Sequence, residues 1–182
     1  IEIDPTVGRI CQERVKNDNI LIGNAFKKDT YEYLTNWPEG WDLVITNPPY
    51  VRYQSLSTDL SVEFEIPNAQ AIRQDLDLTI EQFSYLEERE RRFLKSLIRS
   101  YSGFSDIAVP SWLLSASLVK PGGKLAIVVP GTWLNREYAA IVQYLLLKWF
   151  TIEFVVEDVN STWFADAQVK TNLLIAKRRS RC

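Results

Sequence analysis

Apolar runs alternate with helical patterns along the chain, and this alternation predicts β/α units laid on a largely parallel sheet. After a short strand stub at the start, the pattern indicates an amphipathic helix over 6–16, a short strand over 20–22 and a short helix over 28–35. Residues 42–46 form an apolar run typical of a buried strand, and two prolines directly after it end that strand.

After Tyr50 the pattern becomes polar and helical over 51–103. This stretch predicts a helical insertion that ends in a charged helix over 79–100. The β/α alternation then resumes. We expect a helix over 105–119 that Pro110 starts or kinks, a turn at 120–123, a strand over 125–129, a helix over 134–149, and strands over 152–156 and 168–177. Because only a short loop separates the last two strands, they should pair antiparallel.

Composition places the chain among ordinary globular domains. Its 182 residues are 46% hydrophobic and 24% charged, enough for one sizeable core. The net charge of -2 indicates no overall basic surface, so any binding of nucleic acid must come from a local basic patch or from a part outside this chain. No apolar run reaches the roughly 18 to 20 residues of a membrane span. We expect an intracellular, cytoplasmic protein without membrane contact.

The residue types that the chain lacks limit the kinds of reaction it can catalyse. The chain has no histidine and two cysteines, Cys11 and Cys182, so neither a disulfide framework nor a metal site is predicted. Any reaction must proceed without the commonest general base. The chain also has no methionine and opens abruptly at Ile1 on what looks like the end of a strand. We therefore expect a fragment of a longer protein.

The chemistry is concentrated in Asn47, Pro48, Pro49 and Tyr50, which follow the strand over 42–46. In open α/β sheets, ligands sit outside the carboxyl ends of the strands. The side-chain carbonyl of Asn47 and the backbone carbonyl of Pro48 can accept both N–H groups of a planar amine, which would localise its lone pair for attack on a methyl group. Tyr50 offers a flat face for a base. The alternative is a plain strand-ending turn, since Asn and Pro favour turns.

This tetrapeptide resembles that of the amino-methyltransferases, in particular the adenine methyltransferases of bacterial restriction-modification systems. The resemblance extends over nearly the whole chain. It implies a Rossmann-like class I S-adenosylmethionine-dependent fold with an antiparallel last strand, of which residues 1–182 are a partial catalytic domain. It also implies S-adenosylmethionine as cofactor and transfer of its methyl group to the N6 amino group of adenine in DNA.

The same resemblance assigns further site residues. Glu2 matches the acid that binds the ribose hydroxyls of the cofactor, and Ile3 packs on its adenine; an ordinary solvated acid is the alternative for Glu2. Asn24, Ala25 and Phe26 match the next cofactor motif, and Asn47 also borders the cofactor. The family usually has Asp where this chain has Asn24, which accepts a hydrogen bond but carries no charge. Core packing is the alternative role of Phe26.

Near the end of the chain, Phe164 resembles the aromatic residue that packs on a flipped base opposite Tyr50. Packing in a hairpin core is the alternative. Arg52 contacts a phosphate in this interpretation or is a solvated charge. Two parts of the family pattern are missing: the glycine-containing first cofactor motif, and a target-recognition domain through which double-stranded DNA would be read. A restriction endonuclease module is a further expected partner.

Two other functions stay open on the sequence. A methyltransferase acting on a protein glutamine amide or an RNA base would use the same tetrapeptide, because all these targets present a planar amino nitrogen. A non-catalytic DNA-binding module of the same fold would explain Asn24 and the missing first motif. The insertion of about fifty residues after Tyr50, against typical connections of about 2–6 residues, favours a large nucleic-acid partner.

Overall fold

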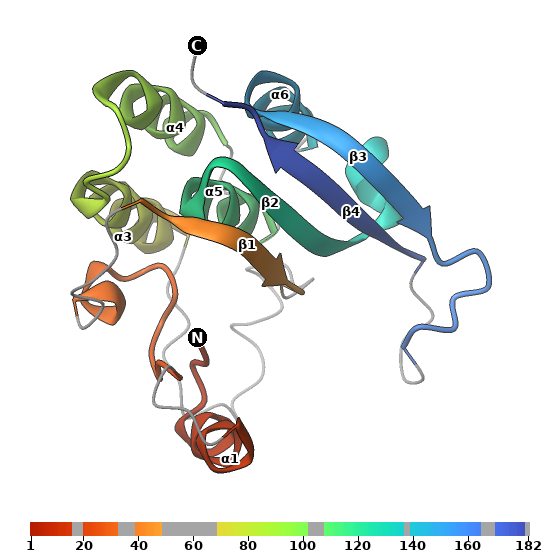
Figure 1. Ribbon diagram of the computed structural model, residues 1–182, viewed down its shortest axis with the longest axis horizontal. Helices are drawn as coiled ribbons and strands as arrows, with labels where there is room; N and C mark the ends of the chain where they lie inside the picture. The colour runs from red at the N-terminus through yellow and green to blue at the C-terminus, as the bar shows by residue number, and fades with distance from the viewer. Residues whose placement is uncertain are drawn as a thin grey trace.

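Four strands form one mixed sheet in this computed structural model, which describes residues 1–15, 20–32, 39–48, 69–101, 108–136, 139–164 and 170–180. The strands are β1 (Trp41–Thr46), β2 (Val119–Pro130), β3 (Phe150–Glu157) and β4 (Thr171–Arg178), in the spatial order β1-β2-β4-β3 (Figure 1). β1 and β2 are parallel, while β4 is antiparallel to both of its neighbours. The predicted α/β class and the antiparallel last strand are confirmed.

One face of this sheet carries the core. Leu125 and Ile127 of β2 pair with Ala176 and Leu174 of β4, and all four side chains are fully buried. Helix α5 (Ala108–Leu118) covers this face and contacts both β1 and β2, and every residue from Ala108 to Ser117 is buried. Pro110 lies in the first turn of α5, where its missing N–H costs nothing.

Other helices pack around α5 on the same side of the sheet (Figure 1). They are α3 (Ala69–Gln82), α4 (Glu88–Ser100) and α6 (Ala139–Trp149), and a 3-10 helix, η2 (Gly131–Leu134), precedes α6. The predicted helix over 134–149 is therefore confirmed in its second half, since Gly131–Leu134 is a separate turn. A search of the described residues finds no helix long and apolar enough to cross a membrane.

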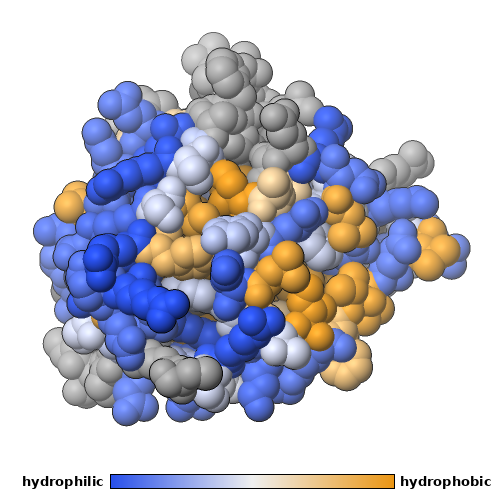
Figure 2. Space-filling model, turned by 90° about the horizontal axis from the view of Figure 1, so that it is seen from above, coloured by the Kyte–Doolittle hydropathy of each residue, from blue (hydrophilic) through white to orange (hydrophobic). Residues whose placement is uncertain are grey.

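The opposite face of the sheet exposes apolar side chains. Ile45 of β1 is 74% exposed, although it belongs to a predicted buried strand, and Phe154 of β3 is 59% exposed. Seen from above, apolar side chains also gather on the side of the molecule where α6 and β3 lie (Figure 2). The exposed large apolar residues of these two elements are Tyr144, Leu147, Ile152, Phe154, Val155 and Val156. The described residues thus cover one face of β2 and β4 fully, while β3 at the edge of the sheet stays largely exposed.

The insertion contains two helices where the sequence predicted one charged helix over 79–100. α3 ends at Gln82, and α4 begins after Glu87. Glu87 and Glu90 form a reciprocal capping box, which starts a new helix at this point. Between the helices, Tyr85 turns into the core, where its hydroxyl donates a hydrogen bond to the backbone carbonyl of Ser117 at 2.9 Å. The prediction of a single helix is therefore wrong, because capping and burial of Tyr85 outweigh helical periodicity.

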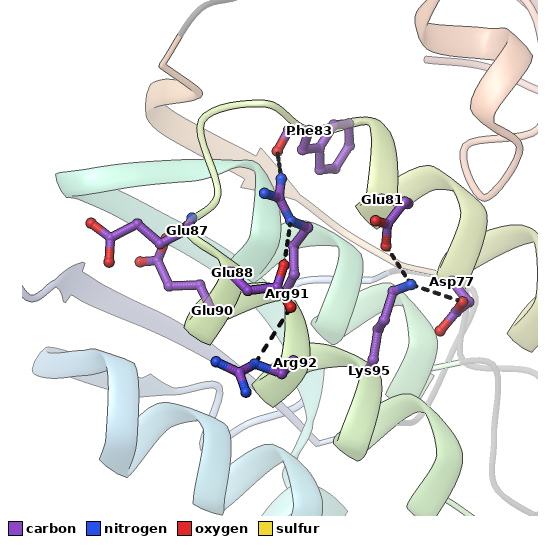
Figure 3. A network of polar contacts seen from close by, with 9 residues as sticks. All are labelled: Asp77, Glu81, Phe83, Glu87, Glu88, Glu90, Arg91, Arg92 and Lys95. Carbon is purple, nitrogen blue, oxygen red and sulfur yellow. Dashed lines mark hydrogen bonds and ion pairs between the residues drawn. The ribbon is translucent and has the colours of Figure 1, made fainter.

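Polar contacts join the two insertion helices (Figure 3). Lys95 of α4 reaches back to α3, where its ammonium contacts Glu81 and lies 3.2 Å from Asp77. Arg91 donates a hydrogen bond to the backbone carbonyl of Phe83 at 3.1 Å, in the loop between the helices. The hydrogen bond from Lys95 is the main reason that the pKa of Glu81 is lowered. The two helices consequently form a braced antiparallel pair.

A buried arginine fastens this helix pair to the sheet. The guanidinium of Arg178, at the end of β4, donates to the backbone carbonyl of Val119 and pairs with the carboxylate of Glu90 in α4. It also lies 4.2 Å from the ring centroid of Trp149 at the end of α6. Burial of a charge is tolerated here because every side of the guanidinium meets a partner. Arg178 thus connects β2, β4, α4 and α6.

The described residues of the amino-terminal segment lie beside the sheet and contribute no strand to it (Figure 1). Helix α1 (Pro5–Val15) matches the predicted helix. A 3-10 helix, η1 (Lys28–Tyr31), forms the start of the helix expected over 28–35, and residues 33–35 of that prediction lie outside the described residues. The two short strands expected near the start reduce to one isolated parallel bridge between Glu2 and Ile22. In α1 only Gly8 is buried. The side chain of Ile22 packs closely against it, since an added Cβ at Gly8 would meet Ile22 at 2.6 Å.

The predicted turn at 120–123 lies inside β2 as an irregularity in its pairing with β1. Trp41 pairs with Val119 and Leu43 with Lys124, so the residues between them bulge out of the ladder. Gly122 has a φ of 83°, a value that favours glycine. At Gly123 an added Cβ would meet the backbone carbonyl of Trp41 at 2.8 Å. Both glycines are needed to bring β2 against the start of β1.

Candidate functional site at the strand ends

The predicted catalytic tetrapeptide begins directly where β1 ends. β1 closes at Thr46, and Asn47 follows as an exposed residue. Pro48 is buried, so the alternation of covered and exposed residues along β1 continues through Asn47 and Pro48. Pro49 and Tyr50 lie outside the described residues. The structure thus places Asn47 and Pro48 at the carboxyl end of β1, and their catalytic role stays a prediction.

Packing and strand pairing fix the carboxyl end of β1. Its residues Val44 and Thr46 point to the covered face, where Val44 packs against the core and the strand contacts α5. The parallel ladder to β2 continues to the last residue of the strand, since Thr46 pairs with Ile127. Asn47 therefore projects from the end of a strand that is paired and packed up to the preceding residue.

Two predicted cofactor segments are brought together by the backbone. The N–H of Glu2 donates to the carbonyl of Leu21 at 2.9 Å, and the N–H of Gly23 donates to the carbonyl of Glu2 at 2.8 Å. This pairing places Glu2 next to the start of the segment that contains Asn24. The Glu2 carboxylate is half-buried and accepts a hydrogen bond from the N–H of Asp4 at 2.9 Å, while Ile3 is exposed. The contact of the Glu2 carboxylate is local, and the cofactor role of this residue stays a prediction.

The segment from Asn24 to Lys28, which we call the cofactor loop, is shaped by side-chain hydrogen bonds. Asn24 Oδ1 accepts from the N–H of Phe26 at 2.9 Å, a local turn typical of Asn and Asp. The carbonyl of Asn24 accepts from the Thr30 hydroxyl at 2.7 Å, and the carbonyl of Ala25 accepts from the Tyr31 hydroxyl at 2.7 Å. The loop thus keeps its shape without a regular backbone ladder.

Helix α3 completes this set of bonds from a distant part of the sequence. The hydroxyl of Thr79 donates to the carbonyl of Phe26 at 2.7 Å, and Gln82 Nε2 donates to the carbonyl of Lys28 at 3.0 Å. Phe83 meets the ring of Tyr31 edge to face, with ring centroids 5.5 Å apart. Sequence reasoning missed Thr79 and Gln82, because a threonine and a glutamine on a polar helix carry no signal of a partner fifty residues away.

Burial decides the role of two aromatic residues here. Phe26 belongs to the hydrophobic core, which supports the core-packing alternative for its ring. Tyr31 is also buried, and this burial raises the pKa of its hydroxyl far above the ordinary value, so the group remains a protonated donor to Ala25. The backbone of Phe26, rather than its ring, is the part that the surrounding residues position.

Phe164 is half-buried and is the last described residue before 165–169. The turn that leads to it is organised by Asp158, whose carboxylate accepts hydrogen bonds from the N–H groups of Thr162 at 3.0 Å and Trp163 at 2.8 Å. Burial tends to raise the pKa of Asp158, but these hydrogen bonds outweigh it and lower the pKa below its ordinary value. Asp158 was missed in the sequence, although Asp before Asn and Ser is a recognisable turn signal.

The described residues connect these parts as follows. The two cofactor segments bond directly to each other, and the cofactor loop bonds to α3. α3 packs on α5, and α5 packs on β1, which ends at Asn47. A polar side chain at the carboxyl end of a strand of a mixed α/β sheet, as Asn47 is here, is typical of Rossmann-like enzymes that bind a nucleotide-like cofactor. This is the class of protein that fold and site together define.

A family model describing the Eco57I restriction-modification methylase matches residues 6–164. The chain belongs to this family. A methylase of this kind takes its methyl group from S-adenosylmethionine, which is therefore the cofactor, and the predicted Rossmann-like methyltransferase fold is confirmed. The match supports a methyltransferase of a restriction-modification system as the general class of this chain.

Individual relatives are distant. The type II methyltransferase M.AccI from Acinetobacter calcoaceticus is 22% identical over 178 residues, which is 96% of this chain and 26% of that protein. This chain therefore spans about a quarter of the length of that relative. A candidate class I S-adenosylmethionine-dependent methyltransferase from Listeria monocytogenes is 18% identical with a TM-score of 0.46, over 78% of this chain and 33% of that one. A candidate DNA modification methylase from Thermus thermophilus is 18% identical with a TM-score of 0.34, over 88% and 52%.

Proposed function

We propose that this chain carries the catalytic site of a DNA methyltransferase that transfers a methyl group from S-adenosylmethionine to the N6 amino group of adenine. The observation that carries the proposal is the position of Asn47 and Pro48. Asn47 is exposed at the carboxyl end of a packed parallel strand, and Pro48 is anchored beside it. Membership in a restriction-modification methylase family supports DNA as the substrate.

The chemistry follows from the acceptors at this strand end. The lone pair of an adenine amino nitrogen is delocalised into the ring, which makes it a poor nucleophile. The side-chain carbonyl of Asn47 and the backbone carbonyl of Pro48 would each accept one N–H, which draws the lone pair onto the nitrogen. Asn47 and Pro48 would thereby hold the amine ready to receive the methyl group that a bound cofactor would supply. The proton that the amine gives up could pass to solvent, so no histidine is required.

The residues that would hold the cofactor fit its chemistry. Glu2 supplies a half-buried carboxylate, the kind of group that captures ribose hydroxyls at the end of a strand. Ile3 is exposed and offers apolar surface to an adenine ring, and the cofactor loop with Asn24 and Ala25 begins right beside Glu2. When bound, S-adenosylmethionine supplies the electrophilic methyl group. The chain's own residues bind it and hold the acceptor amine in line.

The target base would lie between aromatic side chains. A base cannot be methylated inside the DNA stack, so we infer that it is flipped out and held by Tyr50 on one side and Phe164 on the other. Phe164 is half-buried at the end of a turn that Asp158 fixes, which is compatible with a partly accessible ring. The assignment of Tyr50 rests on the tetrapeptide alone.

Partners of the whole protein belong to the same proposal. Double-stranded DNA would be read by a target-recognition domain outside this chain, since the net charge of -2 provides no broad basic surface. A restriction endonuclease module, in the same or another polypeptide, would complete the system that the family name describes.

Substitution of Asn47 tests this function. In the intact natural polypeptide, whatever its full length, Asn47→Ala should lower methyl transfer to duplex DNA by at least about a hundredfold, as loss of a key polar group in an active site commonly does. Gln74→Ala is the matched control, because Gln74 is another exposed amide, on α3. Radiolabelled methyl groups and mass spectrometry of the digested DNA identify the product nucleoside.

Each outcome of this experiment decides a specific point. N6-methyladenine from the parent and the Gln74 variant, and none from the Asn47 variant, would support the proposal. Methyl groups found on cytosine, on RNA or on a protein glutamine would overturn the proposed substrate. An Asn47 variant as active as the parent would remove this residue from the mechanism. DNA binding without any transfer by the parent would favour the non-catalytic module.

A further inference from the structure

The cofactor loop is unusual in how its backbone carbonyls are satisfied. Four of them accept hydrogen bonds from side chains: Asn24 from Thr30, Ala25 from Tyr31, Phe26 from Thr79 and Lys28 from Gln82. Two of these donors lie in or beside η1, and two lie on α3, more than fifty residues further along the chain. The shape of the loop therefore depends partly on a helix of the insertion.

Thr79 is the best placed of these donors. Its side chain is fully buried, and its hydroxyl is 2.7 Å from the carbonyl of Phe26. The residues around it on α3, Ile72, Leu76 and Ile80, are fully buried as well, so the helix cannot shift without opening the core. A carbonyl buried in such surroundings needs a donor, because an unsatisfied one would cost about 1–3 kcal/mol. Thr79 thus ties the middle of the loop to a rigid element.

We propose that Thr79 is a positioning residue for S-adenosylmethionine, acting through the backbone of Phe26 to hold Asn24 and Ala25 in their binding geometry. Gln82 assists from the exposed end of the same helix by fixing Lys28. This inference rests on the proposed function, since it takes the cofactor loop as the contact to the cofactor. It gives the insertion after the catalytic tetrapeptide a task in cofactor binding as well as any contact with nucleic acid.

Thr79→Val removes the hydroxyl and keeps the shape of the side chain. In the intact natural polypeptide, this variant should raise the dissociation constant for S-adenosylmethionine, measured by calorimetry without DNA, by about tenfold, which corresponds to one hydrogen bond of ordinary strength. The KM for the cofactor should rise similarly, while kcat at saturating cofactor and the KM for DNA stay within about twofold. Thr79→Ser, which restores a hydroxyl, should return the cofactor affinity to near the parent value.

Thr171→Val is the matched control. Thr171 is another fully buried threonine, in β4, but its hydroxyl has no hydrogen-bond partner among the described residues. Its replacement should leave the affinity for the cofactor unchanged. Hydrogen–deuterium exchange of peptides covering residues 23–32 gives a second measurement, and Thr79→Val should speed exchange there. Gln82→Ala, at an exposed position, should weaken the cofactor about two- to threefold if the buried variant does not fold.

The outcomes separate this inference from the proposed function. Thr79→Val with the parent's cofactor affinity and unchanged exchange would overturn the positioning role, even if Asn47→Ala still abolished methylation. A weakened cofactor that Thr79→Ser does not rescue would also overturn it, because general loosening of the core would then be the cause. A shifted and rescued affinity in a protein that methylates no adenine would support the positioning role and contradict the proposed substrate.

Discussion

Ile127 and Ile45 lie on neighbouring strands of one sheet, yet the first is fully buried and the second is 74% exposed. Ile127 points to the face that α5 covers, with Leu125 and Val129 on the same side of β2. Ile45 points to the other face. Parallel strands normally have both faces covered and are therefore apolar throughout. An apolar run therefore indicates only that a strand can be buried. The helices that pack on the sheet decide which face of the strand is buried.

The largest effect should come from truncating the covered face. Ile127→Ala removes buried methylene groups and leaves a cavity under α5, so we expect it to lower the free energy of unfolding by about 3–4 kcal/mol. Ile45→Ala should change it by less than about 1 kcal/mol. Urea unfolding monitored by circular dichroism measures both. Equal losses in the two variants would show that the exposed face is covered in solution.

A second contrast concerns two glutamates in the first turn of α4. Glu90 contacts the buried guanidinium of Arg178, so Glu90→Gln should cost about 2 kcal/mol by removing the charge that this guanidinium requires. Glu88 is exposed, with its carboxylate 3.5 Å from Arg92 and 3.7 Å from Arg91. Glu88→Gln should cost less than about 0.5 kcal/mol. A smaller loss for Glu90→Gln than for Glu88→Gln would contradict the role of Arg178 as the fastening between insertion and sheet.

The pH dependence of stability probes the loop between β3 and β4. The pKa of Asp158 is lowered in the folded state, so its charged form stabilises the fold at neutral pH. That contribution is present above the ordinary pKa of about 3.9 and is lost as the pH falls through the lower folded value. Asp158→Asn should therefore be less stable than the parent at pH 7, and the difference should shrink progressively below about pH 4. A difference that does not vary with pH would rule out the charge as its source.

The smallest effect is expected at Thr171. Its buried hydroxyl lacks a hydrogen-bond partner within the described part of the chain, so Thr171→Val should leave stability unchanged or raise it by up to about 1 kcal/mol. Thr79→Val, which breaks the bond to Phe26, should lower stability by about 1–2 kcal/mol in the same assay. A destabilised Thr171 variant would indicate a partner for this hydroxyl that these contacts do not include.

Much of the fold was predictable because local patterns report local geometry. The apolar runs predicted β1 and β3 to within about two residues, and the short loop before the last strand indicated its antiparallel pairing. For β2 they predicted only the second half, because the strand begins at Val119, before the expected turn. The predicted helix over 79–100 failed at Tyr85, because burial of that side chain against Ser117 is a long-range event. The place of β4 between β2 and β3 was likewise absent from any local window.

The candidate site shows the same division. Asn47 could be placed at a strand end from the sequence, since an apolar run followed by two prolines fixes where a strand stops. The pairing of Glu2 with Gly23 could be anticipated only through the resemblance to a family. The bond from Thr79 to Phe26 could not be anticipated at all, because polar residues on a helix do not reveal which of them faces a distant carbonyl.

By itself, the sequence determined the α/β class, the position of the Asn47 tetrapeptide after β1 and the family to which the chain belongs, because these depend on periodicity and short motifs. Only the tertiary structure decided that α3 supports the cofactor loop, that Arg178 joins the insertion to the sheet, and that Ile127 of β2 is buried while Ile45 on the neighbouring β1 is exposed. These features depend on contacts between segments far apart along the chain, which form when the core packs and which no local pattern encodes.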